Sequence, residues 1–93
     1  MIQSFADPTT EAVYRGRRPK GFPAAIFTAA RRKLAYLDRA IDLNELRAPP
    51  GNRLHPLLHE RAGQHAIRVN DQYRICFRWT ERGPAEVEIV DYH

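Results

Sequence analysis

The stretch IRVNDQYRICFRW, residues 67–79, decides the fold, because apolar and polar residues alternate in it on both sides of a polar turn. Alternation with a period of two is typical of strands that bury one face. Pairing Ile67 with Ile75 keeps the apolar face continuous across a hairpin. That register requires a loop with an odd number of residues, 70–72. The stretch therefore predicts two antiparallel strands.

A third alternating run follows and extends the hairpin. Val87 and Ile89 alternate with glutamates, and the same parity pairs Trp79 with Val87 and Phe77 with Ile89. The aromatic residues of this stripe, which begins at Tyr73, are more typical of a core than of a base-stacking platform. The pattern predicts a three-stranded antiparallel meander whose apolar face takes a helix.

That helix is predicted upstream by a different period. Apolar residues recur there at intervals of three or four: Ile26, Ala30, Leu34, Leu37 and Ile41. This spacing places them on one buried stripe of an α-helix. Arg31, Arg32 and Lys33 fall off the stripe, and we expect their side chains at the surface.

The N-terminal region predicts a short strand and a short helix. Residues 2–5 are expected to form an edge strand, after which Asp7 caps a helix that ends at Gly16. The predicted fold is α+β: a small antiparallel sheet, made of the C-terminal meander and the N-terminal edge strand, packed against N-terminal helices. A chain of 93 residues has room for one core, so residues 1–93 are expected to form a single domain.

Composition excludes several classes of protein. No apolar run approaches the roughly 20 residues that a membrane helix needs, and no secretory signal is evident, so a cytoplasmic protein is expected. The single cysteine, Cys76, has no partner for an internal disulfide.

Charge points to a polyanionic partner. The formal net charge is +4, and 13 of the 15 cations are arginine, whose planar donors fit phosphate. The predicted register sets Arg68 across from Arg74, places Tyr92 beside Arg74, and lets Glu88 pair with Arg78. Two arginines would then lack a counter-charge, which favours an anion site. The alternative is that arginine stems cover the sheet while their charged heads lie in water.

The last three residues carry groups that move protons near neutral pH. They are a carboxylate, a phenol and an imidazole, Asp91, Tyr92 and His93. His59 and His65 are expected to be surface or sheet-packing residues. A zinc site formed with His55 is disfavoured by Pro56, which disrupts helical spacing, and no metal or cofactor is predicted.

Three segments carry a resemblance to a known family: LHPL (54–57), QHAIRVNDQYRICF (64–77) and the terminal DYH (91–93). Together and in this order they resemble HigB toxins of the RelE/ParE superfamily, which belong to type II toxin-antitoxin systems. The resemblance implies a RelE-like, microbial ribonuclease-type fold. It also implies a ribosome-dependent mRNA endonuclease that activates a ribose 2'-hydroxyl against the adjacent phosphate.

The resemblance also implies site residues. By position, the family's acid-base residues match His55, Asp91, Tyr92 and His93, and its phosphate-contacting arginine matches Arg74. Either His55 or His93 can be the base, and sequence does not decide between them. Further cations expected to bind RNA are Arg53, Arg61, Arg68, Arg78, Arg31, Arg32 and Lys33. Strict alternation puts Asp91 and His93 on the apolar face, so a twist at the strand end must turn them.

The implied partners are a HigA-like helix-turn-helix antitoxin, the ribosome and mRNA, and operator DNA indirectly through the antitoxin complex. Some HigB proteins carry a lysine where Leu58 and His59 stand here, so a mild toxin is expected. Two alternatives remain: a non-enzymatic ParE-like inhibitor of DNA gyrase, and a degenerate toxin that only partners its antitoxin in repressing their operon. The ParE branch generally lacks the terminal Asp-Tyr-His arrangement, which favours the nuclease.

Overall fold

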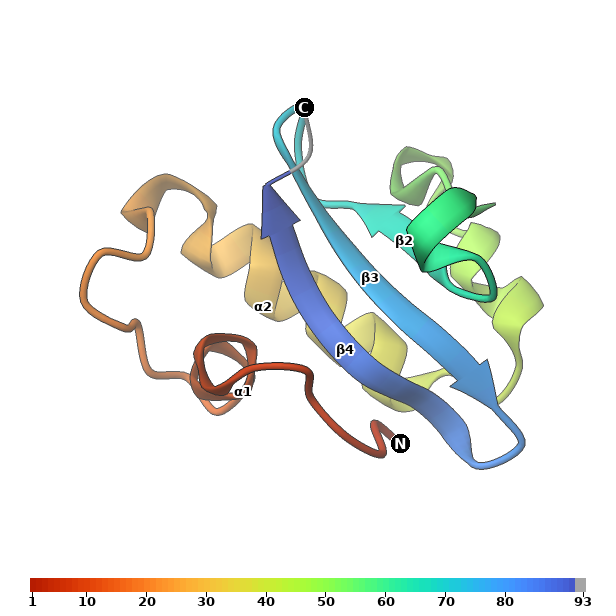
Figure 1. The fold of residues 1–93 in the computed structure, drawn as a ribbon. Helices are drawn as coiled ribbons and strands as arrows, with labels where there is room; N and C mark the ends of the chain where they lie inside the picture. The colour runs from red at the N-terminus through yellow and green to blue at the C-terminus, as the bar shows by residue number, and fades with distance from the viewer. Residues whose placement is uncertain (92–93) are drawn as a thin grey trace.

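The computed structural model describes residues 1–91 and has two α-helices against a four-stranded antiparallel sheet. The helices are α1 (Pro8–Tyr14) and α2 (Ala24–Arg39). The strands, in both chain and sheet order, are β1 (His55–Pro56), β2 (His65–Arg68), β3 (Tyr73–Thr80) and β4 (Gly83–Asp91). Figure 1 shows α2 crossing behind the sheet, with a short helix near residue 60 in front of it. The predicted α+β class is confirmed.

Helix α1 begins as its sequence predicts. The Asp7 carboxylate accepts a hydrogen bond from the Thr10 amide at 2.7 Å, and Pro8 occupies the first helical turn. The helix ends at Tyr14, just before Gly16, whose φ is +88°. Thr10 also joins the helix to the sheet, because its hydroxyl accepts from the Ile89 amide at 3.0 Å.

Helix α2 buries the predicted stripe, with two corrections. Ile26, Ala30, Leu34 and Leu37 are buried. Ile41, by contrast, lies beyond the helix end and is 84% exposed. Lys33 was expected at the surface but is only 6% exposed. It follows Ala30 by three residues and precedes Leu37 by four, so it lies on the same helical face as the stripe.

The connection from α2 to β2 contains three 3-10 helices and one short strand. The 3-10 helices are η1 (Leu43–Arg47), η2 (Pro50–Asn52) and η3 (His59–Arg61). Strand β1 was not predicted. It pairs with β2 through His55 and Ala66 and supplies the fourth strand of the sheet.

The β2–β3 hairpin has the predicted register. Ile67 lies opposite Ile75 and Arg68 lies opposite Arg74. The Asn70 side chain accepts hydrogen bonds from the amides of Gln72, at 2.9 Å, and Tyr73, at 2.7 Å, which closes the turn.

The β3–β4 register differs from the prediction. Ile75, rather than Phe77, lies opposite Ile89, and Trp79 lies opposite Pro84. The register shifts between Cys76 and Arg78, where β4 holds an extra residue and Glu86 takes a left-handed φ of 53°. Opposite Arg74 the pairing differs from the prediction by two residues, so Val90 lies where Tyr92 was predicted.

The predicted edge strand over residues 2–5 is reduced to one parallel bridge between Phe5 and Val87. The segment still lies along β4, because Val87 donates to the Ser4 carbonyl at 3.1 Å and accepts from the Ala6 amide at 2.9 Å. It therefore covers part of the free edge of β4, which limits pairing with another chain.

The sheet buries side chains on both faces. The larger core lies on the helix side and contains Leu34, Leu37 and Phe77. A smaller cluster of Leu57, Ala66 and Cys76 lies on the other face, beneath the segment that leads into η3. Within residues 1–91, no helix is both long and apolar enough to cross a membrane.

Candidate active site

The sheet face that points away from α2 gathers several of the predicted site residues. Residues directly paired across antiparallel strands share a face. One row across this face contains His55, Ala66, Cys76 and Glu88. A second row, two residues along the strands, contains Arg68, Arg74 and Val90.

Arg68 and Arg74 lie opposite each other, as predicted. The Arg74 guanidinium donates to the backbone carbonyls of Asn70 and Tyr73. Arg68 forms an ion pair with Asp71, and this hydrogen-bonded pair lowers the pKa of the Asp71 carboxyl. The expectation that both arginines lack a counter-charge is therefore wrong.

Two further arginines on this face form ion pairs that the sequence did not predict. Glu88 accepts from Arg61 at 3.2 Å, instead of pairing with Arg78. Arg78 pairs with Glu86 at 2.9 Å. The observed β3–β4 register explains the exchange, because Arg78 lies opposite Ala85 and next to Glu86, whereas Glu88 lies opposite Cys76. Both pairs are partly exposed, which leaves these guanidinium groups accessible to a polyanion.

His55 is held by the backbone beside it. Its Nδ1 lies 2.7 Å from the carbonyl oxygen of Arg53. A carbonyl can only accept a hydrogen bond, so the ring nitrogen donates, and the neutral ring carries its proton on Nδ1. The lone pair of Nε2 is then available to another group. Arg53 itself takes a left-handed φ of 48°.

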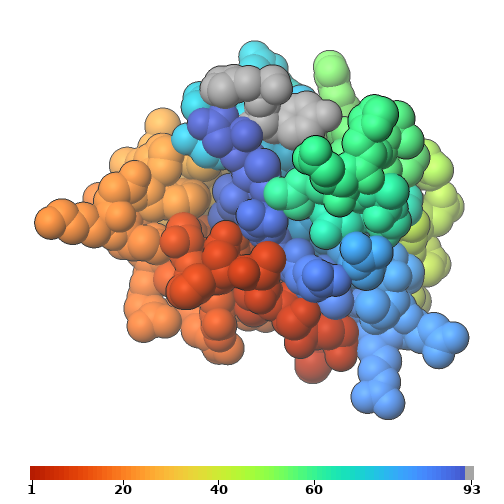
Figure 2. All heavy atoms as spheres, viewed as in Figure 1, coloured from red at the N-terminus to blue at the C-terminus, as the bar shows by residue number. Residues whose placement is uncertain are grey.

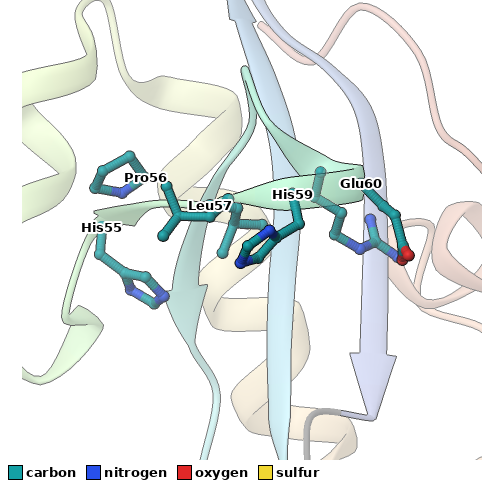
Figure 3. A pocket seen from close by; sticks show the side chains of 7 residues that line it. His55, Pro56, Leu57, His59 and Glu60 are labelled. Atoms are coloured by element: carbon teal, nitrogen blue, oxygen red, sulfur yellow. The ribbon is translucent and has the colours of Figure 1, made fainter.

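A cavity of about 500 Å³ runs along residues 55–61. Figure 3 shows His55 near one end of this lining and Glu60 near the other. The lining includes Leu58, which is 72% exposed, and His59, which has a left-handed φ of 58°. In Figure 2 the same segment, in green, stands beside the strands of the sheet. The cavity thus lies at the predicted RNA-binding face.

His55 and Arg74 share the face but are not in contact. They are separated by two strand spacings and two residues along the strand, which gives a Cα separation of about 12 Å. Because both side chains lie on one face, one extended strand of nucleic acid laid across it could contact both.

Asp91 does not join these groups. It pairs with Tyr73, and strand alternation places its side chain on the face opposite Arg74. There it borders a cavity of about 360 Å³ that Phe22 also lines, and it accepts from the Gln72 side chain at 3.1 Å. The predicted turning of Asp91 toward Arg74 does not occur. Tyr92 and His93 lie outside the described residues.

The three predicted cations of α2 have different environments. Arg31 and Arg32 are exposed, and Arg31 lies over the Phe27 ring at 5.9 Å. Lys33 is buried and donates a hydrogen bond to the Asn52 side chain. The structure therefore contradicts the surface position on which its predicted contact with RNA depends.

Sequence reasoning missed two features near His55. The first is the Lys33–Asn52 pair, of which only the helical spacing of Lys33 gave a signal. The second is His65, which stacks on Phe77 with ring centroids 6.3 Å apart. Burial lowers the pKa of His65, and His55 lowers it further. Across residues 1–91, no three His, Cys, Asp or Glu side chains cluster to hold a metal ion.

Comparison with known proteins defines the class first. The crystal structure of a YafQ mutant from E. coli matches with a TM-score of 0.58, over 98% of this chain and 91% of that one, at 17% identity. A likeness at this identity concerns the fold alone. The family model described as the RelE-like toxin of the type II toxin-antitoxin system HigB matches residues 3–93. The fold and sequence together define a RelE-like toxin.

Two individual relatives indicate which family of RelE-like toxins the chain belongs to. Toxin HigB-1 of Vibrio cholerae serotype O1 is 40% identical over 100% of this chain and 98% of its own length. An uncharacterized protein of Haemophilus influenzae is 33% identical over 61% of this chain and 56% of its own. The chain belongs to the HigB-like toxin family, as its motifs predicted. A toxin of a type II system has an antitoxin as its partner.

Proposed function

We propose that this toxin is a ribosome-dependent endoribonuclease that cuts translated mRNA. The observation that carries the proposal is the placement of Arg68 and Arg74 side by side on the face that also holds His55. Two guanidinium groups on adjacent strands suit a phosphate, and an imidazole on the same face suits proton transfer. Family membership supports the same activity.

In the proposed reaction His55 is the base. Its Nε2 removes the proton from a ribose 2'-hydroxyl, and the resulting oxygen attacks the adjacent phosphorus. The bond from phosphorus to the 5'-oxygen then breaks, and that oxygen takes a proton from an acid, for which we propose Tyr92 or His93. The products are a 2',3'-cyclic phosphate and a 5'-hydroxyl. The tautomer set by the Arg53 carbonyl supports this role for His55.

Arg74 is proposed to stabilise the charge that develops on the phosphate oxygens. Arg68 and Arg61 lie on the same face and are proposed to orient the RNA strand, with Arg53 and Arg78 at its borders. Asp91 lies on the other face, so we propose that it fixes the end of β4 through Gln72.

Delivery of the substrate depends on other surfaces. Arg31 and Arg32 are exposed on α2, and we propose that they contact ribosomal RNA through phosphates, which position a protein without specifying sequence. The proposed antitoxin is a HigA-like helix-turn-helix protein, through which the complex would reach operator DNA.

The test is induced expression followed by mapping of 5' ends on translated messages. We expect wild type to arrest growth and to produce new 5' ends within codons. His55→Gln should lower cleavage roughly 100- to 10,000-fold, which is the range for loss of a general base. Arg74→Ala should lower it roughly 100- to 1,000-fold.

Arg82→Gln is the matched control, because Arg82 is exposed at the β3–β4 turn, away from the site. Growth arrest with intact messages and altered DNA supercoiling would contradict the proposal and favour the gyrase-inhibitor alternative.

A further inference from the structure

The buried Lys33–Asn52 pair joins α2 to the segment that carries His55. The Asn52 side chain is fully buried and accepts a hydrogen bond from the Lys33 ammonium. Its amide nitrogen donates to the carbonyls of Leu46 and Ala48, each at 3.2 Å. The amide of Asn52 is thus bonded on both its oxygen and its nitrogen.

This pair lies one residue from the backbone that holds His55. Asn52 is followed by Arg53, whose left-handed φ of 48° is an uncommon conformation for a residue with a side chain. Such conformations persist where the surroundings determine them strongly. The Arg53 carbonyl accepts from His55 Nδ1 at 2.7 Å. A continuous set of contacts therefore runs from α2 through Asn52 and Arg53 to the imidazole.

We propose that Lys33 is a positioning residue that, through Asn52 and the Arg53 carbonyl, keeps His55 in the tautomer whose Nε2 can accept a proton. The inference rests on the proposed function only for the catalytic use of that tautomer. The tautomer itself is a property of the free protein.

The chemistry of a buried lysine supports this role. An ammonium group removed from water is costly unless it is hydrogen-bonded, and burial lowers the pKa of Lys33, with Arg32 and Arg68 lowering it further. An apolar residue would suit the stripe of α2 better, but it would leave the buried oxygen of Asn52 without its donor. Lysine at this position is therefore explained by Asn52.

The experiment measures the tautomer of His55 by nitrogen-15 NMR of the imidazole rings, with His55→Gln used to assign the signals. Wild type should show one protonated and one bare ring nitrogen, with the proton on Nδ1. Lys33→Met should convert this pattern to a mixture of both tautomers. Lys33→Gln retains a donor for Asn52 and should restore the wild-type pattern.

Arg39→Met is the matched control. Arg39 lies on the same helix and over the same Tyr36 ring as Lys33, at 5.7 Å compared with 5.4 Å, but it is less buried than Lys33. It should leave the tautomer unchanged. If Lys33→Met does not fold, Asn52→Ala replaces it, because it removes the acceptor of the Lys33 hydrogen bond and both donors to the carbonyls of Leu46 and Ala48.

Cleavage of ribosome-bound mRNA is measured on the same variants. Lys33→Met should lower kcat by up to about 100-fold, the effect of a misplaced catalytic group, and Lys33→Gln should recover it. A folded Lys33→Met or Asn52→Ala protein with the wild-type tautomer would overturn the positioning role, whatever its activity. If Lys33→Met changes the tautomer but the wild-type protein does not cleave RNA, the positioning role is retained and the proposed function is refuted.

Discussion

At the scale of single residues, His65 lies beside the proposed site in an environment that disfavours a charged ring. Its Nδ1 is buried and has no hydrogen-bond partner among residues 1–91. A buried polar atom without a partner costs about 1–3 kcal/mol. Burial, then His55, then Arg47 lower the pKa of the ring. The folded state therefore favours neutral His65, whose ring packs on Phe77.

This environment predicts a loss of stability in acid. Because the folded pKa lies below the ordinary value of 6.5, the unfolded chain binds the proton first as pH falls. The contribution of neutral His65 to the free energy of unfolding is complete above pH 6.5. It is lost as the pH falls from 6.5 toward the pKa of His65 in the folded protein. His65→Phe should therefore reduce the loss of unfolding free energy between about pH 7.5 and about pH 5, measured by urea titration.

His59→Phe is the control, because His59 is exposed and lies in η3 rather than in the sheet. His59→Phe should show the same difference in unfolding free energy between the two pH values as wild type. If His65→Phe and wild type lose the same unfolding free energy in acid, other groups cause that loss.

At the scale of elements, two hairpins with similar sequence patterns differed in how well they could be predicted. The β2–β3 register follows from parity, because the polar turn leaves one pairing that keeps Ile67 and Ile75 on the buried face. The β3–β4 register does not follow, because the strands turn over only the two residues between Thr80 and Gly83, and an extra residue at Glu86 then brings Ile89 opposite Ile75. A bulge of this kind leaves little signal in a single sequence.

The same limit applies to the candidate site. The face shared by Arg68 and Arg74 was predictable, since it depends on the hairpin alone. The place of His55 was not, because strand β1 has two residues and no periodicity. The burial of Lys33 was available from its helical spacing, but its charge argued for the surface. Its partner Asn52 is distant in sequence, and no sequence pattern predicted that the two residues would be in contact.

A glycine in the loop between η3 and β2 gives a prediction at this scale. Gly63 has a φ of +92°, and a Cβ there would lie 2.6 Å from Arg78 Nη1. Gly21 has a similar φ of +85° but open space around it. Replacing either by alanine should cost about 1–2 kcal/mol for the left-handed backbone. Gly63→Ala should cost roughly 0.2–1 kcal/mol more, since it displaces Arg78 from its surface ion pair with Glu86.

Urea unfolding of both variants measures the difference, and Gly21→Ala serves as the backbone control. Equal destabilisation would mean that the ion pair between Arg78 and Glu86 contributes nothing to stability.

At the scale of the whole molecule, two separate surfaces of this basic chain, whose net charge is +4, each carry a group of arginines. One is the sheet face with Arg61, Arg68 and Arg74. The other includes Arg31 and Arg32 on α2, which lies on the opposite side of the sheet (Figure 1). This separation is consistent with the proposed function, in which one face contacts the substrate strand and the other a larger RNA surface.

Charge reversals at neighbouring residues of α2 should have different effects, because Arg31 and Arg32 are exposed and Lys33 is buried. Arg31→Glu combined with Arg32→Glu should weaken association with ribosomes. The slope of log affinity against log salt should fall by roughly 0.7–0.9 for each phosphate that the variant no longer binds. Arg39→Glu combined with Arg82→Glu changes the net charge equally at other positions, so it is the matched control.

Lys33→Glu should instead destabilise the fold, because it places a carboxylate against the buried oxygen of Asn52. Cosedimentation over a salt series, with urea unfolding alongside, separates the two effects. If the first pair and its control show the same slope, the α2 cations have no specific contact with ribosomal RNA.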